Sequence, residues 1–423
     1  MKRSGHSKQT HPNQTAEVIL FVHYGEDWIR GSERCLLDLL THIDRRRFNP
    51  VVWCNSKVLA EAVEDLDVQA VVSDFPLLFG WQRPRFALIE FFGLIKKGIE
   101  IVNRHEVRLI HANSGAPNQW LNAVVRTCGI PLVTQLHSRY PLRDRITLGL
   151  HHVTMAIGVS QPVIEQLLAD GMPVERTRVI ANGIDTERLT KQTPVDLRQR
   201  LKLPQDCFLL ATVASLIPRK GVDLLIDAVA QLIEQAVPAR LAVIGDGPEQ
   251  LRLRQQIQSL HLEKHVFLLG EQSNVFGLIQ NVDLFVSGAR EEVFGLVLAE
   301  AGLAALPVVA PAVGGIPSVV ADGISGKLVP PDDSKALADA IADLYRSPEY
   351  RRQMGERGRR HVMKHFTIEK NVQQFEQLYQ CTLDDPGSHM HWLSHWQWWP
   401  AFFNVSRRLL KLTGKKMRLG EVL

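Results

Sequence analysis

The chain has 423 residues, of which 45% are hydrophobic and 22% are charged. The composition excludes wholesale disorder, the length leaves room for two ordinary α/β domains, and a net charge of +4 does not indicate a nucleic-acid partner. Five scattered cysteines, never spaced as CxxC, predict reduced thiols in a cytoplasmic protein without a disulfide framework or a zinc site.

The first part of the chain alternates between strand-like and helical sequence. Residues 1–15 are polar and basic, so we expect a disordered N-terminus that lacks the apolar core of a signal peptide. A β-rich run over 18–24 precedes a loop and a helix that begins at Gly31. Further strands are expected in VVWCN, AVVSD, LIHANS, PLVTQLH and TMAIGVS. This alternation predicts parallel strands with crossover helices on both faces of a sheet.

A second series of strands and helices follows a polar, irregular stretch that we interpret as a linker over about 183–205. Its strands are expected in LLATVAS, LAVIGDGPE, VFLLGE, DLFVSG and PVVAP. Two such domains would place the carboxyl ends of both sheets around a shared cleft. No run reaches the roughly 20 apolar residues that span a bilayer. We predict a first domain over 16–190, a second domain over 191–365, a crossover helix over 366–385 that returns to the first domain, and a tail over 386–423.

The segment 290–330 carries two acidic residues, Glu292 and Glu300, eight positions apart, and a Gly-Gly turn follows them. A helix beginning at Gly295 would direct free backbone N–H groups and the positive end of its dipole at a ligand. The dipole attracts phosphate, whereas the two carboxylates repel it. The combination suits a ligand with both anionic and hydroxyl-rich parts, such as a nucleotide sugar. The structural alternative is that acidic residues favour the first turn of any helix.

Four segments carry a family resemblance: ANGID (181–185), KGVDLLIDA (220–228), VIGDGPE (243–249) and EVFGLVLAEA (292–301). In this order and spacing the chain resembles, over about 17–382, the retaining glycosyltransferases of family 4 (group 1). The resemblance implies the α/β GT-B fold, with two Rossmann-like doubly wound domains facing a central cleft. It also implies a UDP- or GDP-linked sugar as donor, bound by the second domain. The acceptor, expected to be a cell-envelope saccharide or a lipid-linked glycan, would bind the first.

The resemblance assigns roles to single residues. Glu292 is expected to contact the hydroxyls of the donor sugar and His137 to lie near the acceptor and the anomeric carbon, which makes these two the expected catalytic residues. Glu300 would bind the ribose of the nucleotide, and the ammonium of Lys220 would reach a phosphate near a helix N-terminus. The other expected donor-binding residues are Arg219, Gly31, Phe294, Gly295, Leu296, Gly245 and Gly247.

The chain departs from the family at two positions. Ser215 stands where the family has an arginine five positions before Lys220, and Arg219 is the expected substitute. Arg30 replaces the first glycine of the family's Gly-Gly turn, so only Gly31 remains to let the backbone approach the donor phosphate. These departures keep open a catalytically weak or inactive relative that binds the donor or acts as a scaffold. Among enzymes, the alternative is a sugar-nucleotide epimerase or a phosphorylase of related architecture.

Several of these residues also have a purely structural interpretation. Lys220 could be a solvated lysine in a turn, and His111 and His137 could be histidines that merely end strands. The VIGDGP motif lacks the third glycine of a dinucleotide site, so we expect its glycines to form a tight strand-to-loop turn beside the nucleotide. No cofactor or metal is expected, because helix dipoles and cationic side chains would offset the charge of the leaving diphosphate.

The tail combines six large aromatic residues with six basic residues and one acid, Glu421. These aromatic and basic residues are Trp392, Trp396, Trp398, Trp399, Phe402, Phe403, Arg407, Arg408, Lys411, Lys415, Lys416 and Arg418. Such a segment suits an interfacial helix on anionic lipid, and FALIEFFGLIKKG (86–98), with Phe91, Phe92, Lys96 and Lys97, has a similar character. We therefore expect a cytoplasmic protein that associates peripherally with the inner face of the membrane. Packing of the tail on the first domain is the alternative.

Overall fold

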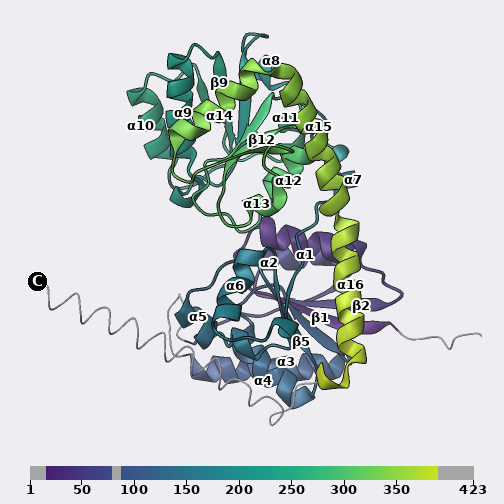
Figure 1. Cartoon of the computed structure of the whole chain (residues 1–423). Coiled ribbons are helices and arrows are strands. Elements are labelled where there is room, and N and C mark those ends of the chain that lie inside the picture. The colour runs from purple at the N-terminus through teal and green to yellow at the C-terminus, as the bar shows by residue number, and fades with distance from the viewer. Residues whose placement is uncertain (1–15, 79–86, 389–423) are drawn as a thin grey trace, which may run out of the picture. The chain divides into compact units, whose positions relative to one another are not determined.

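The computed structural model describes residues 16–78 and 87–388 (Figure 1). The chain divides into two compact units. Unit 1 comprises Met1–Gln135, Tyr140–Ala156 and Glu376–Leu423, and unit 2 comprises Leu136–Arg139 and Ile157–Phe375. The predicted disordered segment, residues 1–15, and the predicted tail from residue 389 onward lie outside the described residues.

The first sheet has seven strands in the order β3-β2-β1-β4-β5-β6-β7. The pairs β1–β2, β1–β4, β2–β3 and β4–β5 are parallel. The apolar run Ile19–Val22 in the central strand β1 is fully buried, as is typical of a parallel strand covered on both faces. The strands are β1 (Glu17–His23), β2 (Phe48–Cys54), β3 (Gln69–Val72), β4 (Leu109–Ala112), β5 (Leu132–Leu136), β6 (Met155–Gly158) and β7 (Thr177–Val179).

Helices connect these strands and cover the sheet (Figure 1). Helices α3 and α4 pack against each other, and Gly98 of α3 allows a close approach, because a Cβ atom there would lie 2.7 Å from Val124. The helices are α1 (Gly31–His42), α2 (Lys57–Glu64), α3 (Leu88–Arg104), α4 (Asn118–Cys128), α5 (Leu142–Thr147) and α6 (Gln161–Ala169). The predicted alternation of strands and crossover helices is therefore confirmed for the first series.

The second sheet has six strands in the order β10-β9-β8-β11-β12-β13, and every neighbouring pair is parallel. The order reverses between β8 and β11, and open α/β sheets bind ligands outside the carboxyl ends of the strands at such a point. The strands are β8 (Phe208–Val213), β9 (Ala239–Ile244), β10 (Val266–Leu268), β11 (Leu284–Val286), β12 (Val308–Pro311) and β13 (Gly326–Val329).

Unit 2 has its own apolar core, in which α9 packs against α14 beside the central strands. The helices of this unit that follow β7 are α7 (Thr186–Thr190), α8 (Leu197–Arg200), the 3-10 turn η3 (Pro218–Lys220), α9 (Val222–Glu234), α10 (Gln250–Ser259), α11 (Val275–Ile279), α12 (Leu296–Leu303), α13 (Ile316–Val319), α14 (Ser334–Arg346) and α15 (Pro348–His365). The strands of the two sheets fall within the domains predicted over 16–190 and 191–365, although residues 157–190 group with unit 2.

The last long helix, α16 (Ile368–Asp384), begins in unit 2, and its residues from Glu376 onward belong to unit 1. Tyr379 on this helix is fully buried, and its ring packs edge-on to Phe21 of β1 and Phe48 of β2. Glu376 accepts a hydrogen bond from the backbone N–H of Asp44 at 2.8 Å. The end of α16 is therefore part of the first core. Within the described ranges, no helix has the length and apolar character needed to span a bilayer.

Candidate active site

Two glycines bring the loops after β8 and β11 into backbone contact. Gly221 has φ +58°, and a Cβ atom there would lie 1.8 Å from the carbonyl oxygen of Gly288. A Cβ atom at Gly288 would in turn lie 2.1 Å from the carbonyl oxygen of Gly221. The backbone N–H of Arg290 donates to the carbonyl oxygen of Arg219 at 2.8 Å. Residues far apart in the sequence therefore meet at the point where the strand order reverses.

This contact joins two of the residues singled out from the sequence. Lys220 Nζ donates to Glu292 Oε2 at 2.5 Å, and the side chains are 19% and 15% exposed. The other carboxylate oxygen of Glu292 accepts from the N–H of Val293 at 3.0 Å. An ammonium has three donors and a carboxylate about four acceptor sites, so this pair retains capacity for a ligand that carries both phosphate and hydroxyl groups.

The Gly-Gly turn that follows in the sequence holds the backbone of Glu292. Gly314 has φ +54°, and a Cβ atom there would lie 1.8 Å from the carbonyl oxygen of Glu292. Gly315 donates its N–H to the same oxygen at 2.9 Å, and a Cβ atom on Gly315 would lie 2.1 Å from the carbonyl oxygen of Val293. Only glycines allow this close approach, so the turn fixes the backbone from which the Glu292 side chain extends.

Helix α12 begins as predicted beside Glu292. Gly295 caps it with φ +97°, Leu296 is its first residue, and Glu300, which is partly exposed, lies one turn inside. The side chain of Phe294 is only 3% exposed, and its ring centroid lies 5.7 Å from that of Phe366. The side chain of Phe294 thus belongs to the core, and its predicted contact with a donor would have to come from its backbone.

Gly245 and Gly247 pack against the loop that carries Ser215. Gly245 has φ +131°, and a Cβ atom there would lie 2.1 Å from the carbonyl oxygen of Ala214. A Cβ atom at Gly247 would lie 2.6 Å from the carbonyl oxygen of Leu216. Leu216 also donates its N–H to the carbonyl oxygen of Asp246 at 2.9 Å. The glycines therefore form a tight turn after β9, as expected, and their contact with a nucleotide stays a prediction.

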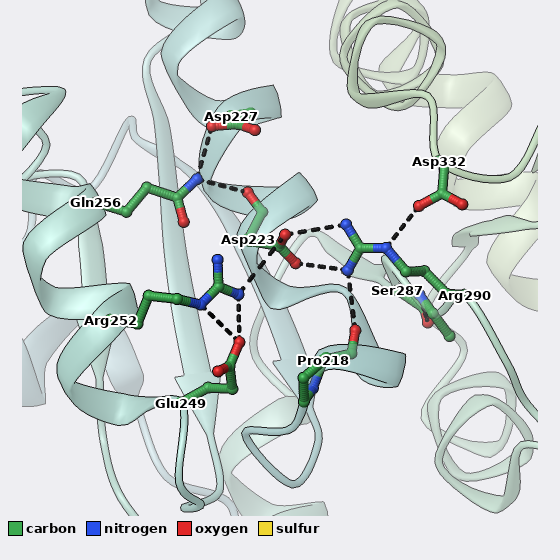
Figure 2. A network of polar contacts seen from close by, with 10 residues as sticks. Pro218, Asp223, Asp227, Glu249, Arg252, Gln256, Ser287, Arg290 and Asp332 are labelled. Carbon is green, nitrogen blue, oxygen red and sulfur yellow. Dashed lines mark hydrogen bonds and ion pairs between the residues drawn. The ribbon is translucent and has the colours of Figure 1, made fainter.

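Figure 2 shows an ion-pair network centred on Arg290. The network holds η3, the turn that carries Arg219 and Lys220. The guanidinium of Arg290 donates to both carboxylate oxygens of Asp223, at 2.9 and 3.0 Å. It also donates to Asp332 at 2.6 Å and to the carbonyl oxygen of Pro218 at 2.9 Å. Because two carboxylates and a carbonyl already engage it, Arg290 acts here as an anchor of the turn rather than as the cation that replaces the family's missing arginine.

The charges in this network stabilise one another. Hydrogen bonding to Asp223 raises the pKa of the Arg290 guanidinium above its usual value. Burial alone would raise the pKa of Asp223, but the hydrogen bonds and charge of Arg290 and the charge of Arg252 lower it. Arg219 is exposed on the same turn, and Ser215 is half-buried. Arg290 was not predicted as a site residue from the sequence, although it stands directly before Glu291 and Glu292.

The two histidines that end strands differ in their surroundings. His137 directly follows β5, is half-buried and belongs to unit 2. His111 is fully buried in β4, where its Nδ1 lies 2.5 Å from the hydroxyl of Tyr379. Burial raises the pKa of Tyr379 well above its usual value, so its hydroxyl is protonated at neutral pH. The structural interpretation therefore holds for His111, whereas the catalytic role of His137 stays a prediction.

A buried polar cluster at the end of β1 was not anticipated from the sequence. His23 Nε2 lies 2.9 Å from Glu33 Oε1, and Asn113 Nδ2 lies 3.0 Å from His23 Nδ1. Although burial raises the pKa of Glu33, the hydrogen bond and charge of His23 lower it to about 2. Glu33 also accepts from the N–H of Arg30 at 3.1 Å. A carboxylate thus occupies the first turn of α1, beside Gly31.

The described residues contain no group of three or more His, Cys, Asp and Glu side chains placed to hold a metal ion. The cysteines among them form no disulfide, and Cys35, Cys54 and Cys207 are buried. Burial raises the pKa of the Cys54 thiol to about 11. The side chains predicted to bind the donor in these loops are thus Lys220, the exposed Arg219, Glu292 and Glu300.

Comparison with known proteins gives the family. Residues 196–361 match the model of glycosyl transferases group 1, and residues 29–188 match that of glycosyltransferase family 4. The chain is 33% identical over 273 residues to the D-inositol 3-phosphate glycosyltransferase of Frankia alni, covering 57% of this chain and 67% of the relative. It is 29% identical over 303 residues to the N-acetyl-alpha-D-glucosaminyl L-malate synthase of Bacillus anthracis, covering 69% of this chain and 79% of the relative.

Solved structures show the same fold. The crystal structure of Anabaena Alr3699/HepE in complex with UDP matches with a TM-score of 0.75 at 27% identity, covering 86% of this chain and 99% of that one. The same protein in complex with UDP-glucose matches with a TM-score of 0.73 at 25% identity and the same coverage. The fold is GT-B, with two parallel-sheet α/β domains. The chain belongs to glycosyltransferase family 4, group 1.

Proposed function

We propose that the protein transfers a sugar from a UDP- or GDP-linked donor to a saccharide or lipid-linked acceptor, with retention of the anomeric configuration. The observation that carries this proposal is the Lys220–Glu292 pair, held where the order of the second sheet reverses. The UDP and UDP-glucose complexes of Anabaena HepE, which has the same fold, support a nucleotide sugar as the donor.

Four residues of these loops, together with His137, would have a task in this reaction. Glu300 would accept hydrogen bonds from the ribose, and Glu292 from the hydroxyls of the donor sugar. As the bond from the anomeric carbon to the diphosphate breaks, negative charge develops on the leaving oxygen. Lys220 and the exposed Arg219 would offset this charge without a metal ion. His137 would act near the acceptor hydroxyl and the anomeric carbon.

The test is to incubate the purified protein with radiolabelled UDP- and GDP-sugars and to measure sugar transfer or donor hydrolysis. Turnover of one donor, with release of the nucleoside diphosphate, would support the proposal. Ser215 favours a second candidate, a relative that binds the donor without turning it over. That candidate would show a nucleotide-dependent rise in melting temperature, from binding by mass action, with neither transfer nor hydrolysis.

We expect Glu300→Ala to weaken binding of the nucleoside diphosphate while the fold stays intact. The loss of a charge-assisted hydrogen bond costs about 1.5–3 kcal/mol, which corresponds to roughly 10- to 100-fold in Kd. Calorimetric titration with UDP and GDP measures this change. Glu291→Ala is the matched control, because Glu291 is an exposed acid of the same region. Equal affinity of both variants would remove Glu300 from the donor site.

We also propose that the protein is cytoplasmic and docks peripherally on the inner face of a membrane. Helix α3 exposes apolar side chains, with Leu88 53%, Ile89 86% and Phe92 64% exposed. Lys96, on the same helix, is largely exposed and forms a long ion pair of 3.9 Å with Glu100. The tail, outside the described residues, adds six basic residues, each contributing about 1 kcal/mol near an anionic surface.

Co-sedimentation with liposomes tests this location. We expect the full chain to sediment with vesicles that contain anionic lipid and to be released by salt, which screens the charges. A chain ending at Asp385, and separately the double variant Phe91→Ser and Phe92→Ser, should sediment less. Leu251→Ser is the matched control, because Leu251 is 69% exposed on α10 of the other unit. Equal sedimentation of all these proteins would contradict the proposed docking surface.

A further inference from the structure

A cavity of about 620 Å³ lies in unit 1 at the carboxyl ends of β1 and β2. It is bordered by the loop after β1, the first turn of α1 and the residue after β2. The lining residues are Tyr24, Gly25, Glu26, Asp27, Trp28, Ser32, Glu33 and Asn55. Its volume falls in the range of small-molecule sites, and it lies outside the carboxyl ends of two parallel strands, next to the point between β1 and β4 where the strand order reverses.

Part of this lining is fixed by hydrogen bonds within the protein. Asn55 and Gly25 form a reciprocal pair, in which Gly25 N–H donates to Asn55 Oδ1 at 2.9 Å and Asn55 Nδ2 donates to the Gly25 carbonyl oxygen at 2.8 Å. Glu33 is held by His23, and its side chain also accepts from the hydroxyl of Ser32 at 3.1 Å. The two strand ends and the helix are therefore tied together around the cavity.

The other part of the lining presents side chains outward. Glu26 and Asp27 are exposed, and Trp28 is 41% exposed. The guanidinium of Arg30 lies 4.0 Å from the centroid of the Trp28 ring, and Arg30 does not line the cavity. The indole is thus supported on one side by a cation and offers the cavity an aromatic surface next to two carboxylates.

The negative charge of the cavity lining favours neutral or cationic ligands over anionic ones. Three of the lining residues are acidic and none is basic. The first turn of α1, which would otherwise attract an anion, already contains the Glu33 carboxylate, which accepts from the N–H of Arg30. A ligand that carries a carboxylate or a phosphate would meet like charges. A ligand with hydroxyl or ammonium groups would find acceptors in the carboxylates and an apolar surface in the indole.

We propose that this cavity is the acceptor subsite and that it binds a non-anionic saccharide, with the sugar ring against Trp28 and its hydroxyl or amino groups on Glu26 and Asp27. The inference rests on the proposed function, because it names the class of acceptor for the same transfer. It assigns Trp28, Glu26 and Asp27 as residues that determine acceptor specificity.

Saturation-transfer NMR titrations of the full chain, without donor, test the subsite. The probes are methyl glucoside, glucosamine and glucuronate, which have similar rings and differ in charge. We expect glucuronate to bind at least about fivefold more weakly than methyl glucoside, because one charge pair at 4 Å in water already has this effect. The double variant Glu26→Gln and Asp27→Asn, which leaves Glu33 as the one acidic residue of the lining, should reduce the difference. Glu61→Gln, which changes an exposed acid on α2 of the same unit, should preserve it.

Variants of Trp28 test the aromatic surface. Trp28→Ala should weaken methyl glucoside binding about tenfold, and Trp28→Phe should retain most of it. Both variants should keep the parent protein's response to UDP or GDP in thermal shift, which also shows that they are folded. Binding of methyl glucoside that is unchanged in Trp28→Ala, or equal binding of glucuronate and methyl glucoside to the parent protein, would overturn the proposal.

Different results would reject the proposed transferase activity and the proposed acceptor subsite. Saccharide binding that depends on Trp28, together with no turnover of any nucleotide sugar, would leave the subsite standing and reject the transferase activity. Turnover of a donor with an acceptor that bears a phosphate or a carboxylate, at the same rate in the parent and in the double variant Glu26→Gln and Asp27→Asn, would leave the activity standing and reject the subsite.

Discussion

Lys220→Ala is expected to lower kcat/KM for sugar transfer by about 100- to 1,000-fold, the loss typical when one group that stabilises developing negative charge is removed. The effect should be large because Ser215 replaces the family's arginine and Arg290 is engaged by Asp223 and Asp332. Lys220 would then be the main cation for the diphosphate. The change also leaves the Glu292 carboxylate, which is 15% exposed, without its ammonium partner.

Steady-state kinetics with a saturating acceptor, together with calorimetric titration of the nucleoside diphosphate, measure this effect. Lys327→Ala is the matched control, because Lys327 forms a 2.9 Å ion pair with Asp343 in the same unit. It should leave kcat/KM unchanged. Ser215→Arg in the Lys220→Ala protein should restore part of the donor affinity, since it returns a cation to the loop. Donor binding that stays near normal in Lys220→Ala would place the phosphate elsewhere.

Gly314→Ala is expected to reduce turnover strongly and to destabilise unit 2. The residue has φ +54°, and the new Cβ atom would lie 1.8 Å from the carbonyl oxygen of Glu292, so the loop that carries Glu292 must move. Left-handed backbone alone costs an alanine about 1–2 kcal/mol. The steric clash adds to this cost. It displaces the backbone of Glu292, the residue expected to contact the donor sugar.

Gly323→Ala separates the cost of the left-handed backbone from the cost of the steric clash. Gly323 also has positive φ, +70°, but a Cβ atom there would have no neighbour within 4 Å. This variant should show only the loss of stability caused by the backbone conformation, with normal kcat. Thermal unfolding and kcat of the two variants give the comparison. Similar melting temperatures and similar turnover in both would show that the Gly-Gly turn does not position Glu292.

Local sequence patterns were sufficient to predict the architecture. The apolar run over 18–24 and the alternation of strands with helices correctly indicated two parallel sheets, because the burial of a strand or of a helix face depends on residues close in sequence. The order of the four family segments correctly indicated the family. Gly314 of the Gly-Gly turn and Gly245 of VIGDGP were visible as turn residues for the same reason, since positive φ is a property of a single residue.

The partners of the polar side chains were decided only by the tertiary structure. Lys220 and Glu292 lie 72 positions apart in sequence, and Arg290 and Asp223 lie 67 apart. The sequence did not show that Phe294 and His111 are core residues or that Glu33 pairs with His23. Strand order determines which loops meet, and a hydrogen bond requires its two atoms to lie within about 3 Å, so a local pattern can name a charged residue without fixing its partner.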